Sequence, residues 1–279
     1  MASPVHITVA QLAKLIGTHK CPTIIDVRID EDFDSNPRYI PTAIRCSHLE
    51  IQQLANRLEG HAVDRPIVVY CHKGLKLSEG AASILRTKGF KSEVLTGGIE
   101  AWKESALPLV PHSNIPERNE MQQTVWVTRL RPKIDRIACP WLIRRFIDPQ
   151  AQFLFVSSTA VEAVAEKFNG IAFDIENVFW SHRGEKCTFD TMVEEFELQS
   201  DALNRLATIV RAADTDRLEL SAQAPGLLAA SLGLSRMYSD DLEQLDAGIQ
   251  LYDAFYRWCR DATAESHTWQ VGGAKEGRP

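Results

Sequence analysis

The feature that most constrains the fold is a short segment in which an apolar run leads directly into a polar loop and then a helix. The run PIVVYC (66–71) has the composition of a buried strand, and HKGLKLS (72–78) follows it without a break. Helical periodicity then continues to Gly89, a residue suited to ending a helix. A strand, loop and helix in this order are typical of a parallel α/β sheet, whose ligand sites lie at the carboxyl ends of strands. Cys71 occupies such a position.

The rest of the first 110 residues repeats this alternation. Thr8 and Gln11 form a candidate capping pair before a helical face. We therefore predict an α/β domain over residues 1–110, with a parallel sheet that carries helices on both faces. Further strands are expected at 23–28 and 92–98, and a helix at 49–58.

The second half of the chain has a different pattern. PHSNIPERNEMQQ (111–123) is polar, holds two prolines and is predicted to be a linker. Residues 124–262 are expected to form a helix-rich α+β domain, and residues 263–279 a mobile tail. In the second domain we expect strands at 124–130 and 151–156, and helices around 158–169, 188–197, 201–213, 224–233 and 240–261.

Length and charge exclude several classes of function. A chain of 279 residues is long enough for two domains, and its net charge of −6 gives no reason to expect nucleic acid or an anionic membrane as a partner. The opening residues lack the features of a signal peptide, and no apolar run is long enough to span a membrane. The six cysteines include no CxxC pair, so we expect a cytoplasmic protein with free thiols.

The loop after Cys71 favours nucleophilic chemistry. Backbone N–H groups and the amino end of a helix attract an anion, and the same field stabilises a thiolate. Lys73 and Lys76 add positive charge that favours the thiolate and can hold an anionic substrate. The alternative is a structural cysteine buried at a strand end.

The first domain resembles the rhodanese family over most of residues 5–110. The matching motifs are Asp26-Val27-Arg28, IPTAI (40–44), Cys71-x-x-Gly74 and LTGGIEAW (95–102). The resemblance implies that Cys71 takes sulfur from thiosulfate or another sulfane-sulfur donor as a persulfide and passes it to a thiol or to cyanide, with no cofactor required. It also implies a set of substrate-binding residues, namely His72, Lys73, Gly74, Leu75, Lys76, Leu77 and Arg28.

The loop departs from the sulfurtransferase pattern by one residue. Ser78 lies seven residues after Cys71, where the family usually has a serine six residues after. Longer loops are typical of the phosphatase and arsenate-reductase relatives, which enclose a tetrahedral oxyanion. Those relatives carry an arginine at the sixth position, where this chain has Leu77, and this substitution weakens the phosphatase interpretation.

The second domain opens with a concentrated basic stretch. RLRPKIDRIACPWLIRR (129–145) holds six cations against one acidic residue. Arginine forks bind oxyanions, and a helix that begins near Cys139-Pro140 would add N–H donors. The alternative is a solvated basic face neutralised by other helices. The predicted oxyanion-binding residues are Arg131, Lys133, Arg136 and Arg144.

Imidazole, thiol and carboxylate groups follow in the same domain. His182, Cys187 and Asp214 could bind a transition metal. The spacing between His182 and Cys187 is not a recognised zinc pattern, and Thr188-Phe189-Asp190 is also typical of a helix start. Both interpretations remain open from the sequence.

The second domain resembles the C-terminal domain of the ChrB chromate-resistance family over about 125–262. The match rests on RPKIDRIACPWLIRRFIDPQAQFLFV, FDIENVFWSHRGEKCTFDTMVEEF, IVRAADTDR and LYDAFYRWCRD. The resemblance implies a role in chromate response or resistance. Nothing in residues 1–110 is typical of a winged helix, so DNA binding is not expected. Two hypotheses follow: a sulfurtransferase joined to an oxyanion- or metal-binding domain, or a non-enzymatic chromate or metal sensor or handler whose first domain is a thiol switch or scaffold.

Overall fold

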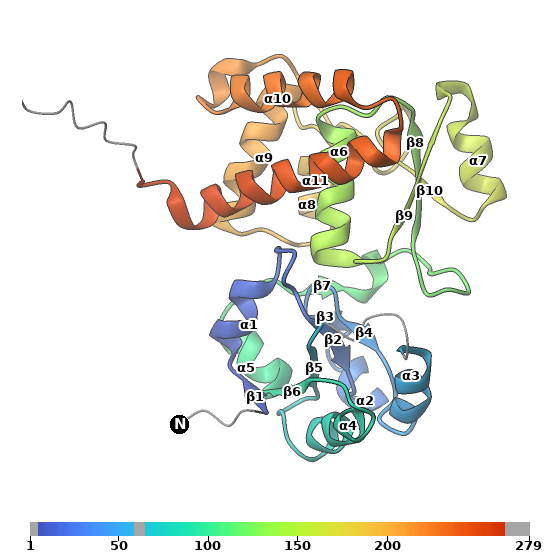
Figure 1. Ribbon diagram of the computed structural model, residues 1–279, viewed down its shortest axis with the longest axis vertical. Coiled ribbons are helices and arrows are strands. Elements are labelled where there is room, and N and C mark those ends of the chain that lie inside the picture. The colour runs from blue at the N-terminus through green and yellow to red at the C-terminus, as the bar shows by residue number, and fades with distance from the viewer. Residues whose placement is uncertain (1–4, 59–64, 266–279) are drawn as a thin grey trace, which may run out of the picture.

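The first half of the chain folds around a five-stranded parallel sheet with strand order β1-β6-β5-β2-β4 (Figure 1). The computed structural model describes residues 5–58 and 65–265. The strands of this sheet are β1 (His6–Ile7), β2 (Thr23–Asp26), β4 (Ile44–Arg45), β5 (Ile67–Tyr70) and β6 (Ser92–Leu95). The helices are α1 (Val9–Leu15), α2 (Asp30–Asp34), α3 (Ile51–Leu58), α4 (Lys76–Thr87) and α5 (Gly98–Glu104).

Helices cover both faces of this sheet because successive strand residues point to opposite sides. On β5, Val68 belongs to the apolar core shared with α1 and α5, whereas Val69 belongs to the core shared with α3 and α4. The predicted α/β fold is confirmed. The predicted capping pair is also present, since the Thr8 side chain accepts the N–H of Gln11 at 3.2 Å and the Gln11 side chain accepts the N–H of Thr8 at 2.9 Å.

The segment predicted to be a linker begins with ordered structure. β7 (Val110–Pro111) pairs antiparallel with β3 (Arg38–Tyr39), and a 3₁₀ turn spans His112–Asn114. The Asn114 side-chain amide donates to the backbone oxygen of Glu195, and Arg118 forms an ion pair with the buried Asp148 at 3.0 Å. The segment is therefore attached to the second domain at two points.

The second half of the chain is rich in helices, as predicted, and it contains a three-stranded parallel sheet with order β10-β8-β9. Its strands are β8 (Val125–Arg129), β9 (Gln152–Val156) and β10 (Ile171–Ala172). Its helices are α6 (Asp135–Leu142), α7 (Val161–Lys167), α8 (Thr188–Glu195), α9 (Asp201–Asp214), α10 (Ala224–Met237) and α11 (Asp241–Arg257). Shorter helical turns lie at Ile143–Ile147, Ser158–Ala160, Leu218–Leu220 and Trp258–Ala262.

The start of α6 differs from the sequence-based expectation. The helix begins at Asp135 rather than near Cys139-Pro140, and Pro140 lies inside it. A proline there removes one backbone donor. The helix still continues into a π-helical turn at Ile143–Ile147, where the Asp148 N–H donates to the oxygen of Ile143. The early start places Asp135 in the first turn of the helix.

The two halves pack against each other through a shared apolar core. Gly17 after α1 lies so close to Phe146 and Tyr256 that an added Cβ would be 2.6 Å from each ring. The Thr42 N–H also donates to the backbone oxygen of Phe146 at 2.8 Å.

Most of the predicted mobile tail, 266–279, lies outside the described residues. Among the helices of the described residues, none combines the length and apolar character needed to cross a bilayer.

Candidate functional site

Cys71 lies directly after β5, at the carboxyl end of a central strand, and the loop 72–75 connects it to α4. Its side chain is buried, and its Sγ lies 3.3 Å from the hydroxyl oxygen of Ser78. The Ser78 hydroxyl donates to the backbone oxygen of Leu75 at 3.0 Å, so this oxygen can accept a proton from the thiol. The serine therefore reaches the thiol although it lies one residue later than the family pattern.

Two glycines bring the loop close to the start of α5. Gly74 and Gly98 have φ values of 67° and 60°, which L side chains rarely adopt. An added Cβ on Gly98 would lie 2.5 Å from the Gly74 nitrogen and 2.6 Å from the His72 oxygen. At this contact the N–H groups of Ile99 and Glu100 bond to the oxygens of Cys71 and His72, at 3.1 and 3.2 Å.

This contact sets the direction of the first two peptide groups of the loop. In a trans peptide the C=O and N–H groups point in opposite directions, so carbonyls turned toward α5 leave the next N–H groups turned away from it. None of the backbone N–H groups from His72 to Ser78 donates to a protein acceptor within the described part of the chain. A run of free backbone donors beside a thiol is the kind of arrangement that can bind an anion.

The remaining loop side chains lie at the surface or against the neighbouring core. Lys73, Leu75 and Lys76 are exposed, whereas Leu77 is half-buried and packs against the α3–α4 core. His72 Nε2 lies 3.8 Å from a carboxylate oxygen of Glu100. Both lysines are therefore available to an anionic donor that approaches Cys71.

Arg28 does not fit the predicted substrate-binding role. Its guanidinium is fully buried and bonds to both carboxylate oxygens of Asp26, at 2.6 to 3.0 Å. The same group donates to the backbone oxygens of Asn36 and Arg38. Arg28 therefore ties the end of β2 to β3, and we correct its assignment to a structural role.

A second group of polar residues gathers around His182 in the second domain. Its Nε2 lies 3.5 Å from Asp135, 3.4 Å from Asp174 and 3.2 Å from Asp214. Asp135 begins α6, Asp214 ends α9, and Asp174 and His182 lie on the loop after β10. Hydrogen bonds to Asp174 and Asp214 raise the pKa of His182 to about 10.

The carboxylates of this cluster differ in environment. Burial, reinforced by the charges of Asp214 and Asp174, raises the pKa of Asp135 well above its usual range. Burial acts on Asp174 in the same direction, but hydrogen bonds from His182 and Thr188 and two nearby arginines outweigh it and lower the pKa of Asp174. Hydrogen bonds and neighbouring cations therefore stabilise the ionised form of Asp174. The surroundings of Asp135 disfavour its ionised form.

Of the four predicted oxyanion-binding residues, only Arg136 joins the cluster, and there it faces a carboxylate. Its Nε lies 3.3 Å from Asp174. The side chain of Arg131 donates instead to the backbone oxygens of Ser235 and Tyr238 at the end of α10. Arg144 pairs with Asp246, and Lys133 lines a separate small cavity beside α11. The structure therefore does not assemble these four cations into one oxyanion site.

The Cys187 thiol is not a free ligand of the cluster, although it lies close enough to Asp135 to hydrogen-bond that carboxyl and oppose the rise of its pKa. It is buried at the N-cap of α8, and its Sγ donates to Asp190 at 3.3 Å while its N–H donates to the same oxygen at 3.1 Å. Burial raises the pKa of this thiol well above its ordinary value. The helix-start interpretation of this segment is confirmed, and Asp135 takes the place that the sequence suggested for Cys187.

Sequence reasoning missed Asp135 as a member of this group, and it placed Asp174 in the same polar region as His182 without choosing it as a ligand. Asp135 counted only as the single acidic residue of the basic stretch. The available signal was its place at the start of the helix that follows β8. Its partner Asp214 is 79 residues away.

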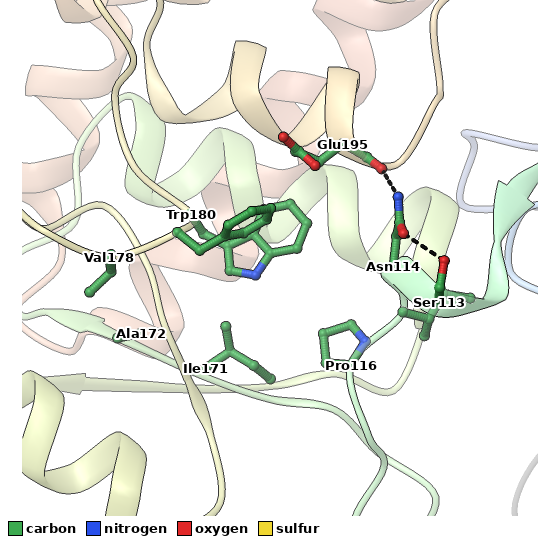
Figure 2. A pocket seen from close by; sticks show the side chains of 10 residues that line it. Ser113, Asn114, Pro116, Ile171, Ala172, Val178, Trp180 and Glu195 are labelled. Carbon is green, nitrogen blue, oxygen red and sulfur yellow. Dashed lines mark hydrogen bonds between the residues drawn. The ribbon is translucent and has the colours of Figure 1, made fainter.

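A cavity of about 570 Å³ lies between the 113–116 segment and the second domain (Figure 2). Figure 2 shows Pro116, Ile171 and Trp180 lining an apolar side, and Glu195 beside Asn114 on the other. Trp180 is stacked on Phe196 with ring centroids 4.7 Å apart. This cavity is separate from the loop that carries Cys71.

In comparison with known proteins, the two halves of the chain match two different families. A rhodanese-like domain model matches residues 8–105, and a model of the ChrB C-terminal domain matches residues 126–259. Thiosulfate sulfurtransferase GlpE of Shewanella oneidensis is 33% identical over 106 residues, which cover 38% of this chain and 98% of that protein. GlpE of Vibrio cholerae is 30% identical over 98 residues, covering 35% of this chain and 87% of that protein.

The second half has a separate relative. Protein ChrB of Cupriavidus metallidurans is 32% identical over 155 residues, which cover 53% of this chain and 46% of that protein. The chain therefore spans about half the length of this relative. The chain belongs to the rhodanese-like family through residues 8–105 and carries a ChrB C-terminal domain at residues 126–259.

Proposed function

We propose that this protein is a sulfurtransferase that uses Cys71 to carry sulfur as a persulfide. The observation that carries the proposal is the thiol of Cys71 at the start of a loop whose N–H groups, from His72 to Ser78, have no acceptor in the described part of the chain. The similarity to proteins named thiosulfate sulfurtransferase supports it.

The reaction has two balanced steps. The Cys71 thiolate attacks the outer sulfur of thiosulfate; a Cys71–sulfur bond forms, the sulfur–sulfur bond of thiosulfate breaks, and sulfite leaves with the electron pair. A thiolate or cyanide acceptor then attacks the outer sulfur of the persulfide and leaves Cys71 as thiolate. The free N–H groups stabilise the negative charge of the persulfide, and Lys73 and Lys76 attract the dianionic donor.

Replacement of Cys71 tests this proposal. Cys71→Ser should abolish thiocyanate formation from thiosulfate and cyanide, and should prevent the mass increase of one sulfur atom on incubation with thiosulfate alone. Cys46→Ser is the matched control, because Cys46 is a buried thiol in the same core and follows β4, which is separated from β5 by β2 in the sheet. Turnover that survives Cys71→Ser, or a wild-type protein that acquires no sulfur, would favour the thiol-switch or scaffold hypothesis.

We propose further that this activity serves chromate resistance, on the basis of the resemblance of the second domain to ChrB. In a host that carries the protein, the Cys71→Ser allele should lower chromate tolerance to the level of the deletion. Tolerance equal to wild type in the Cys71→Ser strain would separate sulfur transfer from any role of the second domain.

A further inference from the structure

The cluster around His182 lies outside the proposed sulfur-transfer site and has no role in that chemistry. We propose that Asp135, His182 and Asp214 bind one divalent transition-metal cation, such as Mn²⁺ or Zn²⁺. This proposal is independent of sulfur transfer at Cys71.

The geometry is close to that of a three-ligand site. One ligand atom from each of the three residues lies within 4.8 Å of the others. Metal–ligand bonds of about 2.0–2.2 Å place two ligands of one metal about 3–4.4 Å apart. Small side-chain rotations therefore suffice to bring the three atoms onto one cation.

Asp135 supplies an independent indication of a missing partner. Its carboxylate is completely buried, and its Oδ2 accepts the N–H of Thr188 at 2.6 Å. Its Oδ1 is also buried and has no hydrogen-bond partner in the described part of the chain. An ionised oxygen that has lost water and gained no partner is unfavourable, and a bound cation would supply that partner.

The distribution of charge separates the three ligands from the fourth acidic residue. Asp174 already faces Arg129 and Arg136, each at 3.3 Å. Within the described residues neither Asp135 nor Asp214 forms an ion pair with an arginine or a lysine. The ion-pair partner of each is His182. Two uncompensated carboxylates and an imidazole suit a divalent cation.

The donor atoms indicate the class of metal. Carboxylate oxygen and imidazole nitrogen suit Mn²⁺, Zn²⁺ and similar first-row cations, whereas a soft metal would require a thiolate. The nearby Cys187 thiol is occupied with Asp190. Because the His182 side chain is 42% exposed, a cation can enter from solvent, and three protein ligands leave coordination positions for water.

The competing arrangement is a protonated His182 that bridges the carboxylates without a metal. Direct binding measurements separate the two. The full-length protein, stripped with EDTA and dialysed, should bind one equivalent of Mn²⁺, followed by the loss of the free-ion signal in electron paramagnetic resonance, and Zn²⁺ should displace it. Bound Mn²⁺ should also raise the melting temperature.

Two ligand variants and two controls complete the test. His182→Gln and Asp214→Asn should each weaken Mn²⁺ affinity at least about 100-fold, since even outer-shell changes cost about 10–100-fold. His19→Gln and Asp216→Asn alter exposed residues of the same types, and both should bind as wild type. The proposal is overturned if the wild-type protein shows neither saturable Mn²⁺ binding nor a melting shift, or if His182→Gln retains full affinity. Thiosulfate turnover, measured in parallel, should be unchanged in the metal-ligand variants.

Discussion

Replacing Gly98 by alanine should damage the loop that carries Cys71 while leaving the Cys71 side chain in place, because the added Cβ would clash first with the backbone oxygen of Cys71. The added Cβ would lie 2.5 Å from the Gly74 nitrogen and 2.6 Å from the His72 oxygen, whereas ordinary contact begins at 3.4 Å. The loop must therefore shift by about 1 Å, a displacement that can cost about 100-fold in rate. Overpacking adds about 1–3 kcal/mol of destabilisation to about 1–2 kcal/mol for a side chain at positive φ.

The matched control is Gly89→Ala. Gly89 has φ of 86° but no atom within 4 Å of an added Cβ, so it incurs the backbone cost alone. We expect thiocyanate formation to fall at least about 100-fold in Gly98→Ala and to stay within about 3-fold of wild type in Gly89→Ala. Urea denaturation should show the larger loss of stability in Gly98→Ala. Equal stability of the two variants, with full activity in Gly98→Ala, would refute the argument that close backbone approach shapes the loop.

Three further predictions concern other groups. Cys71 should be the first thiol alkylated by iodoacetamide in mass-mapped time courses, because burial raises the pKa of each of the other five cysteines; a faster reaction elsewhere would contradict this. Arg28→Met should lower the free energy of unfolding by about 3–5 kcal/mol by leaving the Asp26 carboxylate buried without its partner, and Arg28→Met with Asp26→Asn should recover part of the loss in urea titrations. Burial raises the pKa of Cys21 from 9.0 to about 11, so above pH 9 the thiol loses its proton more readily in the unfolded chain than in the folded one. The free energy of unfolding should therefore fall by about 2 kcal/mol as the pH rises from below 9 to 11. Cys21→Ala should show a correspondingly flatter pH dependence of unfolding.

The alternation of elements in both halves, and the place of Cys71, follow from local sequence. Apolar runs, capping residues and glycines act over a few positions, and the predicted strands at 124–130 and 151–156 appear as β8 and β9. The thiol lies at a strand end because β5 ends at Tyr70. Covalent neighbours alone are enough to place the residue after a strand.

The tertiary structure decided which charged side chains meet. Arg131 and Arg136 are five residues apart, yet one caps α10 and the other faces Asp174. Asp135 approaches Asp214 across 79 residues, and that approach depends on how α6 and α9 pack. Periodicity specifies which face of a helix is buried. The sequence does not show which of many oppositely charged residues will pair with a given arginine or aspartate. Only the packing of distant elements selects one of them, because the energy of a charge pair depends on separation and burial rather than on position along the chain.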